Sequence, residues 1–455
     1  MDAKDVIIAQ QKEQIQVLLQ RVKDLEDEIA RLKKDSSNSS KPPSSDIVKP
    51  MKLPRAVRRK RQQGGQPGHQ KFSRRPFPPE QVDKVVEYEL NAKDAKGLEP
   101  LNEWHIVQQV TLPKKMYIVT EHRARKYRNP NTGRILIAPL PESVQRGGLL
   151  GADVSALAAF LKGDGRMSYS TLRRYFGEVM RLDLSRGLLC KAVQKISGAL
   201  KPSYEQLAGR LPHESYLGVD ETGHHDNGTL LWTWCFQTPA YSVFRIAGRG
   251  VGVLEAMLGQ NYAGVIGCDY WGAYRKYARL FDARMQYCLA HLIREIRFLA
   301  GHSRRTLARW GDQLLLWLKK LFQTLHRKEK YTTCRFQQAM ARIQEGFLLR
   351  MRRPPNHKLA KKLARRFRGQ AADHYFRFMT DPNVAPTNNA TEQAIRHPVI
   401  DRRITQGTRG DAGMRWCERI WTTLSTCKKQ HRNAFEFIHT SLLAHWTDHR
   451  YPVLL

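Results

Sequence analysis

The segment that reads Ser215-Tyr216-Leu217-Gly218-Val219-Asp220-Glu221-Thr222 has the clearest secondary-structure pattern in the chain. Apolar and polar residues alternate in it, which predicts a strand with Leu217 and Val219 on one face and Asp220 on the other. Three more strands are predicted over residues 229–236, 241–246 and 263–269, the last ending in Asp269. Short turns join the first three as hairpins, and a helix over 252–258 precedes the fourth.

This order of elements is that of the ribonuclease-H-like fold. Two hairpin-linked strands follow the first one, and a helix then leads to a strand parallel to it. In that order the first and fourth strands lie side by side. Asp220 and Asp269, both at or near strand ends, are therefore predicted to be neighbours.

Two neighbouring carboxylates repel each other by roughly 4 kcal/mol at about 4 Å and an effective dielectric of about 20. A shared proton or a divalent cation relieves that repulsion. Oxygen ligands without a His or Cys cluster suit Mg²⁺ or Mn²⁺, and two such ions per active site are suited to cutting and joining phosphodiesters. The alternative is two unrelated surface carboxylates, since Asp is common at strand ends.

A third carboxylate is expected from a helix. Glu392 lies in the first turns of a helix that follows the breaker-rich residues 381–386, and Arg396 comes one turn later. A helix-dipole contact and an ion pair with Arg396 would explain Glu392 equally well, at only about 0.3–1 kcal/mol. From physics alone Glu392 is not distinguished from Glu221, Asp282 or Glu295.

The charge balance points to a polyanionic partner. The chain has 455 residues, with 77 Lys and Arg against 42 Asp and Glu, for a net charge of +35. The basic residues are spread along the chain among Trp, Tyr and Phe, which favours nucleic acid over a short histone-like or ribosomal protein. Seven Cys without framework spacing suit free thiols in a reducing compartment. No leader peptide or membrane span is expected, so a cytoplasmic location is predicted.

The first 35 residues are predicted to form a coiled coil. Heptad spacing puts β-branched residues at one seam position and Leu at the other, which favours a parallel dimer. The first set is Ile8, Ile15, Val22 and Ile29; the second is Leu18, Leu25 and Leu32, with Gln11 weakening its start. The alternative is an amphipathic helix packed on its own globular domain.

A disordered basic linker is predicted over residues 36–80, because its Ser-, Asn- and Pro-rich stretch has too little apolar surface to fold. It carries Arg58, Arg59, Lys60 and Arg61, which we interpret as an arm that follows DNA phosphates, or else as an ordinary solvated linker.

The rest of the chain divides into five further segments. Residues 81–140 are expected to form a small β-rich domain, with strands near 85–88, 104–107, 116–119 and 135–137. Residues 141–212 contain three helices (149–162, 170–180 and 188–200) that resemble a helix-turn-helix DNA-binding domain, with Arg173 and Arg174 on the second and Ser168 or Ser170 as its cap. The catalytic domain covers 213–300 and 381–430, with a helical insertion over 301–380. A C-terminal helix and tail follow over 431–455. The predicted fold class is thus multidomain α/β.

Five ordered motifs resemble those of insertion-sequence-66-type DDE transposases. They are Lys41-Pro42-Pro43-Ser44-Ser45-Asp46 with Gly64-Gly65-Gln66-Pro67-Gly68-His69, then Val219-Asp220-Glu221-Thr222, Cys268-Asp269-Tyr270-Trp271-Gly272-Ala273-Tyr274, Cys288-Leu289-Ala290-His291-Leu292-Ile293-Arg294-Glu295, and Asn388-Asn389-Ala390-Thr391-Glu392-Gln393-Ala394-Ile395-Arg396. Thr426-Cys427-Lys428 resembles the end of the last block.

The resemblance implies that Asp220, Asp269 and Glu392 bind the metal ions and that the activity is DNA transposition. The implied partners are double-stranded transposon ends and target DNA, a second copy of the chain, and accessory proteins of the element. The implied location is the nucleoid of a bacterial cytoplasm. A ribonuclease-H-fold nuclease or junction resolvase that cuts without joining, and a catalytically inactive DNA-binding regulator, remain alternatives.

The chain departs from the family in residues 81–140. A four-cysteine zinc ribbon is usual there, but residues 91–97 and 128–133 contain no Cys, so no structural zinc is expected. Cys288 and His291 have half of a zinc-site spacing, and a buried thiol beside the site is the simpler interpretation. His291 and Arg294 are candidates to assist at the scissile phosphate. Trp271 and Tyr274 either stack on an unpaired base or are core aromatics.

Overall fold

The computed structural model describes residues 3–32, 76–99, 101 and 104–454. The chain forms two compact units, one made of Met1–Pro50 and His122–Leu455 and the other of Met51–Glu121. Among the described residues, no helix is long and apolar enough to cross a membrane.

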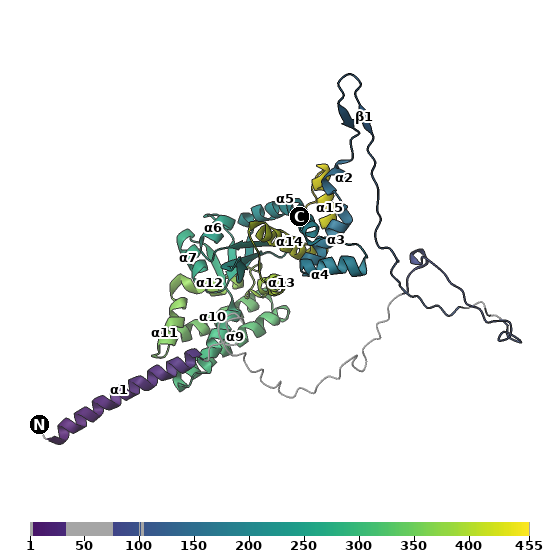
Figure 1. The fold of residues 1–455 in the computed structure, drawn as a ribbon. Coiled ribbons are helices and arrows are strands. Elements are labelled where there is room, and N and C mark those ends of the chain that lie inside the picture. The colour runs from purple at the N-terminus through teal and green to yellow at the C-terminus, as the bar shows by residue number, and fades with distance from the viewer. Residues whose placement is uncertain (1–2, 33–75, 100, 102–103, 455) are drawn as a thin grey trace. The chain divides into compact units, whose positions relative to one another are not determined.

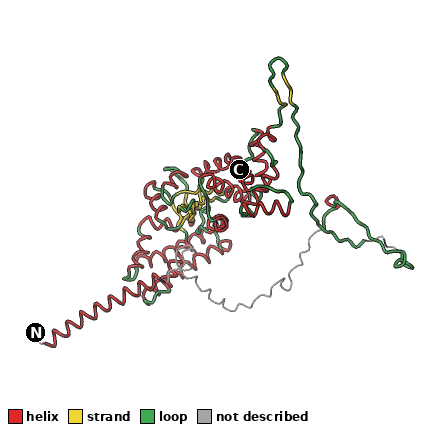
Figure 2. The backbone as a smooth tube through the Cα atoms, in the orientation of Figure 1, coloured by secondary structure: helices red, strands yellow, loops and turns green. Residues whose placement is uncertain are grey.

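A five-stranded mixed sheet lies at the centre of the larger unit (Figures 1 and 2). Its strand order is β5-β4-β3-β6-β7, so the predicted adjacency of the first and fourth strands is confirmed. β3 pairs antiparallel with β4 and parallel with β6. The strands are β3 (Tyr216–Asp226), β4 (Thr229–Gln237), β5 (Ser242–Ala247), β6 (Val265–Cys268) and β7 (Arg284–Tyr287), and the last was not predicted.

Helices cover the sheet and connect its strands. α6 (Gly252–Leu258) joins β5 to β6, α7 (Gly272–Phe281) joins β6 to β7, and α8 (Leu289–Ala300) follows β7. α13 (Asn389–Thr405) packs on β3, which it approaches closely at Gly218. A Cβ at Gly218 would collide with the Thr391 hydroxyl, so the missing side chain allows the helix to lie against the strand.

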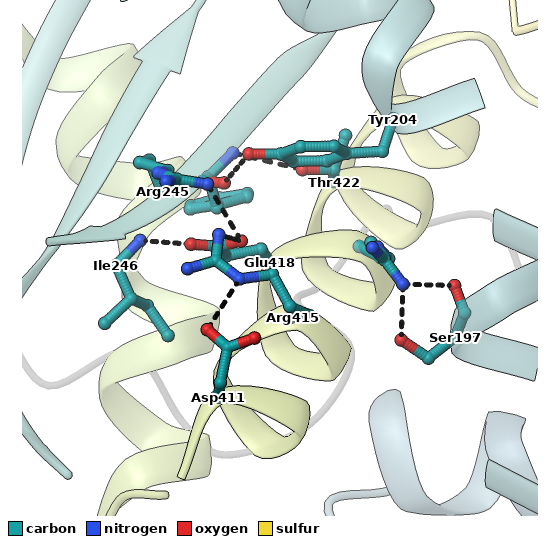
Figure 3. Close-up of polar contacts among 10 residues, drawn as sticks. Ser197, Tyr204, Arg245, Ile246, Asp411, Arg415, Glu418 and Thr422 are labelled. Carbon is teal, nitrogen blue, oxygen red and sulfur yellow. Dashed lines mark hydrogen bonds and ion pairs between the residues drawn. The ribbon is translucent and has the colours of Figure 1, made fainter. Parts of the chain in front are cut away.

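α14 (Asp411–Lys429) covers the open edge of the sheet at β5. Its side chains supply the acceptors that a neighbouring strand would otherwise provide. Ile246 N donates to Glu418 Oε1 at 2.7 Å, Phe244 N to Thr422 Oγ1 at 3.0 Å and Ser242 N to Thr426 Oγ1 at 3.3 Å. Figure 3 shows the Glu418 and Thr422 part of this ladder, with Arg245 and Arg415 around the Glu418 carboxylate.

The helices before the sheet pack with the C-terminal ones. They are α2 (Glu142–Gly147), α3 (Ala152–Gly163), α4 (Tyr169–Arg174), which continues as the π-helix η3 (Tyr175–Val179), and α5 (Arg186–Arg210). α5 runs ten residues past its predicted end, because α14 and α15 (Ala434–Thr447) bury its second half despite Pro202. Ser168 caps α4 by accepting from Thr171 N at 3.0 Å.

The predicted insertion is helical. It contains α9 (Arg305–His326), α10 (Thr333–Arg352), α11 (Lys358–Ala364) and α12 (Asp373–Phe376). Short helical turns complete the chain: η2 (Pro79–Gln81), η4 (Leu211–His213), η5 (Lys328–Lys330), η6 (Arg365–Phe367), η7 (Gly369–Ala372) and η8 (Arg377–Met379).

Three of the four strands predicted within residues 81–140 were wrong. Residues 85–88, 104–107 and 116–119 form no strand, and Val85, Ile106 and Ile118 are exposed. Of the four predicted strands, only the one at 135–137 is present, as β2 (Ile135–Ile137). It pairs with β1 (Lys126–Arg128), which was not predicted. Alternation alone is not enough here, because a strand also needs a partner's hydrogen bonds and a core to bury one face.

The N-terminal prediction of a helix is confirmed by α1 (Ala3–Leu32). Its seam residues at both heptad positions are between 48% and 70% exposed in the single chain. Near its end, Glu26 and Asp27 lie against Arg304 and His357 of the insertion, at 3.2 and 3.3 Å.

Candidate active site

Asp220 and Asp269 lie at the same level of two adjacent strands. The parallel register pairs Gly218 with Gly267, and continuing it by two residues sets Asp220 beside Asp269. Asp220 Oδ1 accepts from Glu221 N at 3.0 Å, and Asp269 Oδ1 accepts from Trp271 N at 2.9 Å, just before α7. The two predicted neighbours are therefore brought together by strand register.

The pKa values of both carboxyls are raised. Burial raises the pKa of Asp220 well above its usual range, and the charges of Glu221, Asp269 and Glu392 raise it further. Burial and Glu221 raise the pKa of Asp269 to about 7, against the opposing effects of the Trp271 N–H and Arg249. Several acids thus share a low-dielectric site that is short of positive charge.

Glu392 reaches the same site from α13. Asn388, the residue before the first residue of α13, connects this helix to β3. Its side-chain amide donates to the backbone oxygen of Val219 at 2.8 Å, and Val219 directly precedes Asp220. Glu392 Oε1 lies 3.5 Å from Arg294 Nη2 and 3.8 Å from His291 Nδ1. Burial and the charge of Arg294 lower the pKa of His291 to about 4, so this imidazole is neutral at neutral pH.

The three other acids considered for the third position have different environments. Glu221 is almost completely buried, accepting from Arg249 Nη2 at 3.0 Å and from the Tyr274 hydroxyl at 2.6 Å. Glu295 pairs with Arg366 at 2.7 Å. Asp282 ends α7, at the opposite end of that helix from Asp269. Glu221 is therefore a fourth carboxylate at the site, already held by a cation and a hydroxyl.

The donor set at this site fits a hard divalent cation. Glu392 Oε1 is buried without a hydrogen-bond partner, and the raised pKa values of Asp220 and Asp269 indicate unmet demand for positive charge. Cys288 Sγ and His291 come within 4.8 Å of a Glu392 oxygen. However, burial raises the pKa of the Cys288 thiol, and its sulfur accepts from Asn388 N. A neutral, hydrogen-bonded thiol is a poor ligand, so the oxygens are the better donor set.

A second group of ligand-type side chains lies where α1 meets the insertion. Asp27, His302 and His357 have ligand atoms within 4.8 Å of one another. Each imidazole accepts a backbone N–H at Nδ1, from Arg304 for His302 and from Leu359 for His357. Because Nδ1 accepts in both rings, Nε2 is the protonated nitrogen, and it lies 3.9 Å from Asp27 Oδ1 in His302 and 3.3 Å in His357. A protonated nitrogen is suited to a carboxylate rather than to a metal.

The predicted DNA-contact residues differ in accessibility. Arg173 and Arg174 are exposed on α4, and Arg396 is exposed on α13. Trp271 is partly buried, whereas Tyr274 is completely buried and is a core aromatic, so its ring is not accessible to a base. The arm residues Arg58, Arg59, Lys60 and Arg61 lie outside the described residues.

Sequence analysis missed Arg249 and Trp232. The guanidinium of Arg249 lies over the Trp232 ring at 3.8 Å and over the Trp271 ring at 4.3 Å. Trp232 belongs to β4, Arg249 follows β5 and Trp271 precedes α7, so only the folded sheet assembles them. No local pattern marks such a group, and the nearest signal is an Arg between two glycines, Gly248 and Gly250.

Asp269 directly follows β6, as predicted, whereas Asp220 lies inside β3 and not near its end, because the hairpin pairing with β4 continues to Asp226. The mixed α/β sheet with these carboxylates is consistent with a ribonuclease-H-like domain. The model of the Transposase IS66 family matches residues 147–416, more than half of the sequence, so the chain belongs to this family of insertion-sequence transposases. Residues 3–75 match a family of unknown function, DUF6444. No curated protein matches the chain. Membership implies DNA transposition by a DDE-type enzyme and confirms the family resemblance; the motifs at 219–222, 268–274, 288–295 and 388–396 lie within the matched residues.

Proposed function

We propose that this transposase cuts phosphodiester bonds at the ends of its element and joins the freed 3′-hydroxyls to target DNA, with Asp220, Asp269 and Glu392 holding two divalent metal ions. The observation that carries the proposal is the register that sets Asp220 level with Asp269, within electrostatic reach of Glu392. Bound Mg²⁺ or Mn²⁺ would supply activation of the attacking oxygen and stabilisation of the leaving oxygen.

The protein's own groups prepare the site for that chemistry. The backbone N–H groups of Glu221 and Trp271 fix one oxygen of each Asp and leave the other carboxylate oxygen for ligation. Arg294 lies near Glu392 and is 27% exposed, so it is suited both to orienting this carboxylate and to contacting a DNA phosphate. Neutral His291 packs beside Glu392 and adds no charge that would compete with a cation.

The partners follow from charge and surface. The net charge of +35 favours DNA, with Arg173 and Arg174 on the exposed face of α4 as contacts to the element ends. Trp271 is not proposed to stack on an unpaired base, because the Arg249 guanidinium already lies over its ring at 4.3 Å. We propose a homodimer formed through α1, accessory proteins encoded by the element as further partners, and the bacterial nucleoid as the place of action.

The test is Mg²⁺-dependent cleavage and joining of the DNA ends that flank the gene, by wild type and by Asp220→Asn, Asp269→Asn and Glu392→Gln. Each substitution is expected to lower the rate by at least about 1000-fold while the protein stays folded. Asp282→Asn is the matched control, and we expect it to keep wild-type activity.

Three results would contradict the proposal. Cleavage without any joined product, on a pre-cut substrate as well, would identify a nuclease or resolvase. Cleavage and joining by Asp220→Asn at the wild-type rate would exclude this carboxylate from the reaction. An inactive wild type that binds the ends would point to a regulator.

A further inference from the structure

Arg249 is held beside the carboxylates by contacts with three other side chains. Its guanidinium is held between the rings of Trp232 and Trp271, at 3.8 and 4.3 Å, and Nη2 donates to Glu221 at 3.0 Å. The backbone before it is also fixed, because the buried Trp234 indole N–H donates to Gly248 O at 2.9 Å. The loop therefore presents a rigid, planar cation rather than a mobile one.

Part of this cation faces solvent. The side chain of Arg249 is 41% exposed, although its Glu221 partner is 4% exposed. A guanidinium has five N–H donors, and the contact with Glu221 uses one nitrogen. The remaining donors lie close to Asp269, because the guanidinium sits over the ring of Trp271, whose backbone N–H donates to that carboxylate at 2.9 Å. The charge of Arg249 also acts on Asp269, whose pKa it lowers.

We infer that Arg249, clamped by Trp232 and Trp271, is a binding site for a DNA backbone phosphate next to the bond that is cut. This inference rests on the proposed function and deepens it. A phosphate fits better than a base, because the guanidinium already occupies one face of each of the two indole rings. Arginine forks bind phosphate in two-point contacts, and a side chain already held in place loses little conformational entropy on binding.

The experiment measures the affinity of the full-length protein for a duplex carrying the element end, without divalent metal, over a series of salt concentrations. Arg249→Gln is expected to weaken binding severalfold and to reduce the slope of log K against log salt by roughly 0.9, the loss of one phosphate contact. Arg249→Lys keeps the charge, so its slope should stay near wild type while its affinity falls. Arg432→Gln removes a cation that lies over Phe437, far along the chain, and is the matched control.

An effect of Arg249→Gln on the stability of the fold must be distinguished from the loss of a phosphate contact. Arg249→Gln leaves Glu221 buried without its cation, so the double variant with Glu221→Gln restores neutrality. The reduced slope should persist in that double variant at a melting temperature near wild type. Return of the wild-type slope there would mean that Arg249 only stabilises the fold, and would overturn the inference.

A substitution scan of the DNA separates phosphate from base. Neutral methylphosphonates placed one at a time should reveal a position that weakens wild type but has no further effect on Arg249→Gln. Sensitivity that follows abasic sites instead would assign the clamp to a base and overturn the phosphate contact. Wild type that binds no DNA at all would contradict the proposed function itself, which distinguishes the two failures.

Discussion

Among the individual residues, Asp220 and Asp269 show how much an alternating pattern reveals. The pattern of residues 215–222 sets the face of Asp220, and the end of the fourth strand sets Asp269. Their adjacency then follows from strand order, which the sheet confirms. Glu392 could not be chosen this way, since its approach depends on Gly218 and Asn388 contacts made across the fold.

Metal-free protein is expected to lose stability as pH rises through the range of Asp269. Its folded pKa of about 7 exceeds the unfolded value of about 3.9, so the folded state binds the proton more tightly. Ionisation of this carboxyl therefore lowers the free energy of unfolding by a few kcal/mol. The loss begins at about pH 4 and is complete above about pH 7. Denaturant unfolding across this pH range should show that the free energy of unfolding of wild type decreases relative to that of Asp269→Asn.

Mg²⁺ gives the complementary measurement. A cation that binds only the folded state should restore stability above pH 7 in wild type and do so far less in Asp269→Asn. A pH profile shared by wild type and the variant would contradict the raised pKa. An equal response of both proteins to Mg²⁺ would place the ion elsewhere.

At the scale of elements, α14 and β5 fit each other because the rise of four residues along a helix is close to the rise of two residues along a strand. Four residues of helix rise about 6 Å and two residues of strand about 6.8 Å. Glu418, Thr422 and Thr426 therefore meet the N–H groups of alternate β5 residues along one stripe. Figure 3 shows Glu418 and Thr422 of this stripe. This pairing protects an open sheet edge without another strand.

Thr422→Val is expected to destabilise the fold by about 1–3 kcal/mol, since a methyl group replaces the acceptor of the buried Phe244 N–H. Thr423→Val is its matched control. The Thr423 hydroxyl donates to Arg419 O within the same helix, so its removal leaves no strand donor unpaired and should cost less than about 0.5 kcal/mol. Equal losses in denaturant unfolding would mean that the ladder adds no stability.

Helices were easier to predict than strands for a physical reason. A helix makes its hydrogen bonds locally, so α3, α6 and α13 follow from the sequence pattern, as does the helical character of the insertion. Strands need distant partners, and residues 85–88, 104–107 and 116–119 alternate without finding any. The extension of α5 through Pro202 is the converse error, because burial against α14 and α15 outweighs a local breaker.

Across the whole molecule, helices near both ends of the chain pack against elements that are distant in sequence. α1 contacts the helical insertion, and α14 and α15 pack on the sheet and on the helices before it. α15 packs on α3 and α5, and α14 closes the sheet, so the C-terminal helices join the helical layer to the sheet. Sequence motifs could indicate the family over much of this region, but they carried no information on such packing. α1 is a long helix whose apolar stripe is left uncovered by the chain itself.

That stripe leads to a prediction about assembly. Leu18→Asp with Leu25→Asp puts charges in the seam of the proposed parallel coil, where burial without a partner is costly, so the full-length protein should change from dimer to monomer. Val17→Asp adds one such charge away from the seam, on an exposed position of the same helix, and should stay dimeric. Light scattering of each protein gives the mass directly. A dimeric seam variant would mean that assembly uses another surface, whereas a monomeric wild type would leave the stripe without a partner and contradict the coiled coil.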